Sequence, residues 1–437
     1  MEIKAFKAYR FNADVVGNTG NCISPPYDVI SDQLQQQLYD KSDYNIVRII
    51  KGKTSSSDTD TSNQYTRAAE YFSKWISQGA LKQDADEIVY SYVQDFDIAG
   101  KTVQRSSFIA LGKIEEFGGT VKPHEKTLDG PKADRLKLQL ACNANFGLIF
   151  MLYKDNKLVA DQICKKSMTN KPLIDFIDEN QTRHRVYSVP DAKDIQSVKA
   201  MLQDKSCVIA DGHHRYETAL NYYKITKNPA AQFQMMAFAN TCNEGLLVLA
   251  THRLVYGIKG FNCDNLIADL SSNFEITDFP FDSAFGKTKA KEKMLAKMKA
   301  DFDSDKNSFG IYCGNNCYKV AVLKNKTAMD AVASDKTPAW RSLNVAVLHK
   351  LILEKTLGID DNALAAKTNL EYVKDTPDAV DDCIAKVDSN KIQAAFFTNP
   401  EKMDQIRMVS DANEKMPQKS TYFFPKVYTG LTVNLIK

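Results

Sequence analysis

The chain has 437 residues, of which 43% are hydrophobic and 25% charged, and its formal net charge is +3. These values are ordinary for a soluble globular protein, so they exclude a collagen-like, a disordered and a supercharged chain. At roughly 100–200 residues per domain, the length predicts two or three domains. A net charge this small provides no bulk attraction to nucleic acid or to an anionic membrane.

No apolar stretch follows the start Met1–Lys7, so we expect no secretory signal. The longest uncharged runs, Leu138–Tyr153 and Asn228–Asn243, contain Asn and Gln and are shorter than the ~20 apolar residues that span a bilayer. The nine cysteines are odd in number and irregularly spaced, and Cys313 and Cys317 lack a second ligand pair for zinc. We therefore expect a reduced, cytoplasmic chain without a membrane segment.

The first elements are two helices, predicted over Ser31–Tyr39 and Tyr65–Ser77 from a serine cap and from the spacing of apolar residues. Between them, Lys51–Asn63 has no apolar residue and is expected to be a flexible loop that cannot pack. Residues Glu87–Ile98 and Thr102–Ile114 read as strands joined by a glycine turn.

Helices and strands alternate along the rest of the chain, which predicts a mixed α/β (α+β) fold. Expected helices are Lys132–Ala141, Tyr216–Lys224, Ala290–Ala300 and Val345–Leu357; expected strands are Phe146–Tyr153, Lys205–Ala210, Gln232–Ala239 and Leu246–Leu249, with a β-rich tail over Tyr422–Leu435.

The strongest local signal is the run Asp211, Gly212, His213, His214 and Arg215, where a buried strand passes through a glycine into a helix. Glycine lets the backbone approach a ligand closely, and the free N–H groups of a helix start bind anions. The arginine adds a bidentate donor, so phosphate is the expected guest. The alternative is a helix cap formed by the aspartate, with solvated histidines.

A second polar cluster begins at His124-Glu125-Lys126-Thr127 and continues to Lys132 and Arg135. The glutamate is a candidate general base or metal ligand, and the cations are candidate phosphate donors. Neither a His-Glu-x-x-His zinc motif nor a P-loop is present. A solvated charged loop is the alternative.

Three further segments are polar and rigid: Ser24–Asp28, where two prolines precede Tyr27 and Asp28; Thr251–Arg253 at the end of an apolar strand; and Pro417–Thr421. The first is more often a structural turn, and the other two are equally compatible with one.

These segments resemble a prokaryotic family classed as a domain of unknown function and numbered one thousand and fifteen. The resemblance is carried by Ser24–Ile30, His124–Arg135, Asp211–Leu220, Gly245–Val255 and Met416–Gly430, in order along nearly the whole chain. It departs from the family pattern at Ala250, where a proline is expected.

The segment Asp211–Arg215 also resembles the phosphate-binding Gly-x-x-Arg turn of the ParB and sulfiredoxin superfamily. That superfamily includes CTP-binding partition proteins, ATP-dependent sulfiredoxins and a free-serine kinase. The resemblance implies a ParB/sulfiredoxin-like nucleotide-binding core with large insertions and an α/β C-terminal region. Sulfiredoxin chemistry is not implied, because His213 stands where its catalytic cysteine would be.

The leading hypothesis is therefore a nucleotide-dependent kinase that phosphorylates a small hydroxyl metabolite, with free L-serine chosen by analogy with the superfamily. ATP or ADP is the expected nucleotide, and Mg²⁺ would be held by its phosphates, with Glu125 as a further ligand, and not by a protein cage. The candidate catalytic residues are Glu125, Asp28 and His124. The candidate nucleotide-binding residues are Asp211, Gly212, His213, His214, Arg215, Lys126, Thr127, Lys132 and Arg135, and the candidate substrate-binding residues are Tyr27, His252, Arg253, Lys419, Ser420 and Thr421.

Two other classes remain open. The runner-up is a non-enzymatic nucleotide-binding regulator of the ParB type. No basic helix-turn-helix pattern accompanies the net charge of +3, so we expect no nucleic-acid partner. A hydrolase or metal enzyme that uses His124, Glu125, His213 and His214 is the third. The oligomeric state is open, with a homo-oligomer as one alternative.

For domain organisation we expect a motif-bearing region over 1–255 with an inserted β-rich segment. An α/β region should follow over 256–437, and its tail, residues 416–430, is expected to return to the site.

Overall fold

The computed structural model describes all residues except 99, 126–128, 361–362 and 364–367. The chain forms two compact units, which are described separately below. The first comprises Met1–Pro123, Thr127–Leu247 and Pro425–Lys437, and the second comprises His124–Lys126 and Val248–Phe424. The fold is a mixture of helices and strands, as the alternating sequence patterns predict.

The first unit is built on a nine-stranded sheet with the order β6-β11-β8-β12-β5-β4-β10-β9, in which β1 also pairs with β5. Pairing is antiparallel except between β12 and β8 and between β11 and β6. The strands are β1 Ile3–Lys4, β4 Val89–Ile98, β5 Lys101–Lys113, β6 Val121–Lys122, β8 Ile149–Tyr153, β9 Ile174–Ile177, β10 Arg183–Val189, β11 Cys207–Asp211 and β12 Phe233–Asn240.

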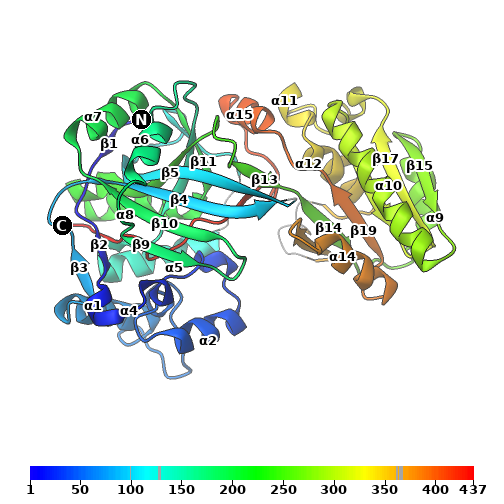
Figure 1. Cartoon of the computed structure of the whole chain (residues 1–437). Coiled ribbons are helices and arrows are strands. Elements are labelled where there is room, and N and C mark those ends of the chain that lie inside the picture. Colours follow the sequence, from blue (N-terminus) through cyan, green and yellow to red (C-terminus); the bar gives the residue numbers. More distant parts are fainter. Residues whose placement is uncertain (99, 126–128, 361–362, 364–367) are drawn as a thin grey trace. The chain divides into compact units, whose positions relative to one another are not determined.

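In Figure 1, α6 and α7 lie above this sheet and α2, α4 and α5 lie below it. The helices of the unit are α1 Ala13–Val16, α2 Asp32–Lys41, α3 Val47–Ile50, α4 Gln64–Ser77, α5 Asp129–Cys142, α6 Val159–Ser167, α7 Ala192–Gln203 and α8 His213–Thr226. Two short pairs complete it: β2 Tyr9–Phe11 with β3 Leu81–Gln83, and β7 Ala144–Asn145 with β21 Asn434–Leu435.

Two hydrophobic cores hold the first unit together. One packs Ala160, Cys164 and Leu202 of α6 and α7 against the sheet. The other joins the helices below the sheet around Phe72 and Trp75 of α4. These helices have the apolar stripes expected from the sequence, so burial of one face explains where they lie.

The second unit has a six-stranded antiparallel sheet with the order β15-β17-β16-β19-β14-β18. Its core forms where Met294 and Met298 of α10 and Ile384 of α14 pack on this sheet. The strands are β14 Thr251–Val255, β15 Phe274–Pro280, β16 Ser308–Tyr312, β17 Cys317–Leu323, β18 Leu370–Lys374 and β19 Ala394–Thr398. The helices are α9 Cys263–Leu270, α10 Ala284–Asp303, α11 Pro338–Arg341, α12 Asn344–Val347, α14 Ala379–Asp388 and α15 Met403–Asp411, and the short strands β13 Leu247–Leu249 and β20 Tyr422–Phe424 stand at the ends of the segment.

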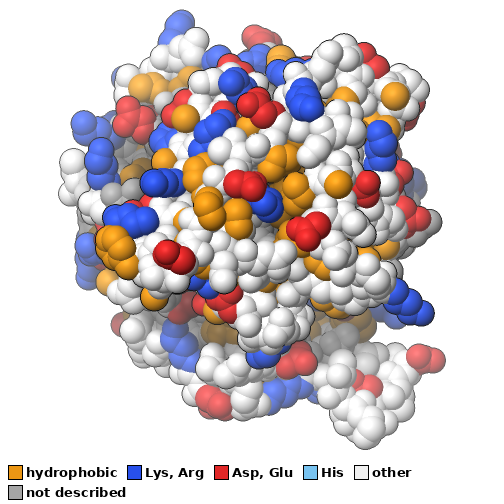
Figure 2. Space-filling view, turned by 90° about the vertical axis from the view of Figure 1, so that its right-hand side faces the viewer, with side chains coloured by type: hydrophobic (Ala, Val, Ile, Leu, Met, Phe, Trp, Pro, Cys, Tyr) orange, Lys and Arg blue, Asp and Glu red, His pale blue; other side chains and the backbone are white. Residues whose placement is uncertain are grey.

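The lysines of α10 do not form a basic face. Lys291 lies 2.5 Å from Asp381, and Lys299 lies 2.8 Å from Asp303. On the side of the molecule shown in Figure 2, basic and acidic side chains lie among one another, with hydrophobic side chains between them. Most of the positive charge on this helix is thus matched locally.

Two predicted elements differ from the structure. The helix expected over Val345–Leu357 is α12 followed by a π-helical segment, η5 Leu348–Glu354. At its end, the Lys355 N–H donates to Lys350 O, five residues earlier. The β-rich tail is strand only at β20 and β21. Between these strands, Pro425 lacks an N–H and its carbonyl accepts a side-chain hydrogen bond, so a regular ladder cannot form there.

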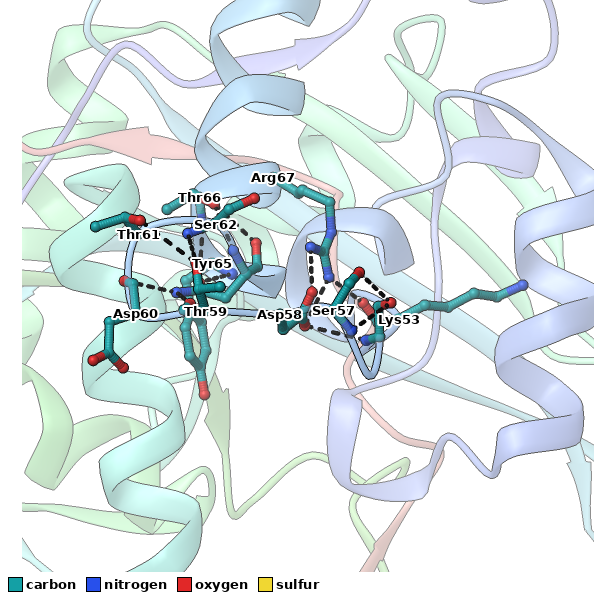
Figure 3. A network of polar contacts seen from close by, with 12 residues as sticks. Lys53, Ser57, Asp58, Thr59, Asp60, Thr61, Ser62, Tyr65, Thr66 and Arg67 are labelled. Atoms are coloured by element: carbon teal, nitrogen blue, oxygen red, sulfur yellow. Dashed lines mark hydrogen bonds and ion pairs between the residues drawn. The ribbon is translucent and has the colours of Figure 1, made fainter.

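The loop after α3, Lys51–Asn63, has no apolar residue and is mostly exposed, as expected. Its polar groups, however, are extensively hydrogen-bonded to one another and to α4 (Figure 3). Arg67 of α4 donates two hydrogen bonds to the carboxylate of Asp58 and a third to Lys53 O. Asn63 caps α4 through the backbone N–H groups of Tyr65 and Thr66. Hydrogen bonds rather than packing define this loop.

Among the described residues, no helix is both long and apolar enough to cross a lipid bilayer.

Candidate functional site

The corner between β11 and α8 is built around a glycine. Gly212 has φ +92°, a conformation that L side chains rarely adopt, and α8 begins at the next residue. A Cβ atom at this position would lie 2.9 Å from Nε of Arg215. The glycine is therefore required both by the turn and by the guanidinium that lies over it.

The side chain of Arg215 lies against two glycines, Gly147 and Gly212, and one of its N–H groups donates no hydrogen bond. Its Nη1 donates to Leu148 O, and a Cβ on Gly147 would lie 3.2 Å from the same nitrogen. Its Nη2 is 3.7 Å from Asp211 Oδ2. The Nε–H group is buried and has no hydrogen-bond partner. A buried donor without a partner costs free energy, so a ligand that accepts a hydrogen bond from this Nε–H would stabilise the complex.

Asp211 organises the cations at this corner. Its carboxylate accepts a hydrogen bond from Gly212 N–H at 2.9 Å and lies 3.2 Å from Lys426 Nζ. Burial alone would raise the pKa of Asp211, but the charges of Lys426 and Arg215 lower this pKa well below its ordinary value. An ionised carboxylate repels phosphate, so Asp211 acts here by holding the cations and not by touching an anion.

Lys426 reaches the corner because its backbone is clamped by two buried side chains of the sheet. Gln94 of β4 donates to Lys426 O at 2.9 Å, and Arg105 of β5 donates to Pro425 O at 2.5 Å. The two side chains also bond each other, Arg105 Nε to Gln94 Oε1 at 3.0 Å. Burial lowers the pKa of Arg105 to about 10. No motif in the sequence marks this clamp; its only signal is polar residues within otherwise apolar strands.

A second arginine lies at the pocket beside this corner. The guanidinium of Arg135 is 4.1 Å from the centre of the Tyr27 ring, and its Nη1 donates to Ile50 O at 2.6 Å. Its Nε donates to Asp134 at 2.8 Å. Burial raises the pKa of Tyr27, so its hydroxyl stays protonated and remains a hydrogen-bond donor.

We call this cavity the arginine pocket. It has about 520 Å³ of empty space when the solvent at its open mouth is counted. Besides Tyr27, Arg135 and Arg215, it is lined by Pro26, Ile50, Leu138, Gln139, Ala144, Asn145, Phe146, Gly147, Thr218, Gln234 and Thr429. Two guanidinium groups, several amides and an apolar wall suit an anion that also carries a flat or apolar part.

Segments distant in the sequence meet at this pocket. Ser24 and Thr429 exchange backbone hydrogen bonds of 3.1 and 2.8 Å, so the segment with Tyr27 lies beside the C-terminal segment. Thr429 and the amides of Gln139, Asn145 and Gln234 were not singled out from the sequence. No motif marks them, because only tertiary contact brings them together.

Several expected phosphate ligands lie elsewhere or are already paired. Lys132 is 2.9 Å from Glu217, so its charge is compensated. His213 is buried and His214 half-buried, and neither lines the pocket. Asp28 is exposed and is also absent from the lining. Lys126 and Thr127 lie outside the described residues.

The second unit brings together another set of the expected residues. His124 is buried, and its Nε2 is 2.8 Å from Thr421 Oγ1. The carboxylate of Glu125 accepts a hydrogen bond from Lys419 N–H at 2.9 Å. These contacts fix the orientation of the glutamate beside Pro417–Thr421.

His252 and Arg253 lie on β14 and are buried. His252 Nδ1 accepts a hydrogen bond from Thr398 N–H at 3.3 Å, and its Nε2 is 3.2 Å from Asp375. Arg253 donates to Lys419 O at 3.1 Å. In the described part of the chain, no three His, Cys, Asp or Glu side chains are grouped so that they could hold a metal ion.

Comparison with solved structures gives weak overlaps. A free serine kinase in complex with AMP has 10% identity and a TM-score of 0.34 over 70% of this chain and 83% of its own. A conserved hypothetical protein from Pyrococcus furiosus has 13% identity and a TM-score of 0.33, covering 72% and 92%. SbnI with a C-terminal truncation, from Staphylococcus aureus, has 10% identity and a TM-score of 0.34, covering 75% and 87%. At such scores these overlaps carry no argument about function.

No curated protein sequence matches the chain significantly. A family model does match, over residues 3–346. This match confirms the resemblance seen in the sequence segments. The chain belongs to the family DUF1015, described as proteins of unknown function.

Proposed function

We propose that this protein is a nucleotide-dependent phosphotransferase that phosphorylates a hydroxyl group of a small metabolite, with free L-serine as the first acceptor to test. The observation that carries the proposal is the buried, unpaired Nε–H of Arg215 at a pocket that also contains Arg135. Phosphoryl transfer depends mainly on positioning and on neutralising charge, which guanidinium groups accomplish.

The nucleotide would bind with its phosphates near Arg215 and the start of α8, where backbone N–H groups point outward from the helix. Arg135 is paired with Asp134, so it would contribute hydrogen-bond donors rather than a spare charge, and the apolar wall with Tyr27 would contact the rest of the nucleotide. ATP or ADP brings the transferable phosphoryl group, and Mg²⁺ would be held mainly by phosphate oxygens. The choice of serine rests on the resemblance of Asp211–Arg215 to the ParB and sulfiredoxin turn.

The acceptor hydroxyl needs a base, and three residues are proposed for that role. Glu125 is preferred because the Lys419 N–H holds its carboxylate in one orientation. Asp28 adjoins Tyr27 of the arginine pocket, and His124 adjoins Glu125. His252, Arg253, Lys419, Ser420 and Thr421 are proposed as acceptor-binding residues.

The first experiment is a thermal-shift titration with ATP, ADP, AMP and inorganic phosphate, because a ligand that binds only the folded state raises the melting temperature. We expect a nucleotide to stabilise the wild type and not Arg215→Ala. The matched control is Arg183→Ala, which removes an exposed arginine paired with Asp175 in the same unit. Full nucleotide affinity in Arg215→Ala would contradict the phosphate assignment, and Arg215→Lys serves if the alanine variant does not fold.

The second experiment measures turnover. Purified protein is incubated with L-serine, Mg²⁺ and ATP, ADP or pyrophosphate, and phosphoserine is quantified. Absence of any phosphorylated acceptor, despite nucleotide binding, would contradict the kinase assignment and favour a nucleotide-binding regulator.

A further inference from the structure

The second unit contains a small cavity of its own, between β14, β19 and η5. Its lining includes Arg253, Thr398, Leu348, Glu401 and Ser420. The empty space is about 230 Å³, including open solvent. Only a small part of this space admits a water molecule, so any ligand that fits must be very small.

Arg253 brings a buried positive charge to this cavity. The residue is 1% exposed. Its guanidinium donates to Lys419 O at 3.1 Å, to Thr251 O and to His349 Nε2 at 3.3 Å, and it lies 4.7 Å from the centre of the Tyr372 ring. Burial, followed by the charge of Arg253, lowers the pKa of His349 well below its ordinary value, so this acceptor is neutral.

No carboxylate among the described residues forms an ion pair with Arg253, and its buried Nε–H has no partner. Every contact that it makes is with a neutral group. The charges of Glu401 and Glu125 oppose the lowering of its pKa by burial, but neither carboxylate bonds to it, so a direct anionic partner would stabilise this guanidinium.

Glu401 brings the opposite charge to the same cavity. It is 4% exposed, and its carboxylate accepts hydrogen bonds from Val345 N–H at 2.7 Å and Asn344 N–H at 3.3 Å. No cation in the described part of the chain pairs with it. Burial raises the pKa of Glu401 to about 7, although the two N–H groups and Arg253 oppose that rise. Arg253 and Glu401 therefore line one cavity without forming an ion pair.

We propose that this cavity binds a small zwitterion, a free α-amino acid with a short side chain, whose carboxylate pairs with Arg253 and whose ammonium group pairs with Glu401. Such a ligand supplies both missing counter-charges at once and adds no net charge. A simple anion would leave the carboxylate of Glu401 unpaired, and a simple amine would leave Arg253 unpaired. The hydroxyl groups of Ser420 and Thr398 can bond a short polar side chain.

This proposal adds to the proposed function a chemical class for the acceptor. Only the statement that the bound amino acid is the acceptor rests on the proposed function. Binding itself needs no nucleotide. The two proposals can therefore fail separately.

The test is calorimetry on the full chain without nucleotide. Glycine, L-alanine and L-serine are compared with N-acetylglycine and glycinamide, each of which lacks one of the two charges. We expect the zwitterions to bind and the analogues to bind at least about tenfold more weakly, since an unpaired buried charge costs more than the 1.4 kcal/mol that corresponds to tenfold. Equal affinity of the analogues, or no binding of any zwitterion, would overturn the proposal.

Glu401→Gln keeps the side-chain shape and removes the charge, so we expect it to weaken glycine binding by at least about tenfold. The matched control, Glu292→Gln, alters an exposed glutamate of α10 and should leave the affinity unchanged. If Glu401→Gln does not fold, the ligand series on the wild type decides the question alone. Arg215→Ala separates the two sites: it should abolish nucleotide binding and retain glycine binding.

Discussion

Each unit contains a carboxylate largely withdrawn from solvent, half-buried Asp211 in the first and buried Glu401 in the second, and the two settings are opposite. In the first unit, Asp211 lies next to Lys426 and Arg215, and their charges lower its pKa. In the second unit, burial raises the pKa of Glu401 to about 7, although two backbone N–H groups that donate to its carboxylate oppose the rise. The first site has more cations than its carboxylate can balance and so favours an anion. The second keeps its charges apart and favours a ligand that carries both signs.

The largest effect is expected from removing the compensating cation of the first site. Lys426→Met should lower the free energy of unfolding by roughly 3 kcal/mol, because it leaves Asp211 without its nearest counter-charge. Urea denaturation measures the change. Combining it with Asp211→Asn should recover part of the loss, whereas additive losses would show that the two groups are not coupled.

The pH dependence of stability should have opposite signs at the two carboxyl groups. The raised pKa of Glu401 means that the folded state binds the extra proton between about pH 4.5 and 7, so its contribution to stability falls as the pH rises through that window. The lowered pKa of Asp211 means that its contribution is present above about pH 3.8 and is lost as the pH falls below that value.

Denaturation curves at several pH values can separate these contributions. Relative to the wild type, Glu401→Gln should remove a decline of roughly 3 kcal/mol between pH 4.5 and 7. Asp211→Asn should alter only the acid limb. An unchanged slope in Glu401→Gln would contradict the raised pKa.

Gly212→Ala should be intermediate in effect. Its new Cβ would lie 2.9 Å from Arg215 Nε in a backbone conformation that disfavours alanine, so we expect a loss of about 1–3 kcal/mol and weaker nucleotide binding. Gly118→Ala is the matched control, since φ is +108° there and no atom lies within 4 Å of the new Cβ. Equal nucleotide affinity in both variants would contradict the role of the glycine in placing Arg215.

The smallest effect is expected at the polar loop of Figure 3, which belongs to neither site. Arg67→Ala removes the pair with Asp58 and the bond to Lys53 O. Because Arg67 and Asp58 are half-buried at the surface and belong to neither hydrophobic core, the melting temperature should change little, while limited proteolysis between residues 53 and 63 should become faster. Arg67→Ala should leave ligand binding at both sites unchanged.

Local patterns in the sequence predicted much of the secondary structure. Ser31 caps α2 through the Leu34 N–H, and the apolar stripe of Tyr65–Ser77 becomes α4. Gly212 was identified because a strand, a glycine and a helix start follow one another directly. Such features depend on neighbours within one or two turns, so they can be recognised without the fold.

The clamp of Gln94 and Arg105 on Pro425 and Lys426 had no such signature. Its two halves are more than 300 residues apart, and neither half carries a motif within its own segment. Glu401 was missed for the same reason, since its place at the cavity with Arg253 depends on how β14 and β19 pair.

The sequence by itself determined the helix and strand periodicities, the glycine corner and the membership of the family. Those properties arise from backbone sterics and from the alternation of apolar side chains over short distances. Only the tertiary structure decided which charges are compensated and which are left for a ligand. Compensation depends on burial and on distances of a few ångströms between remote segments, and the residue types alone do not specify either.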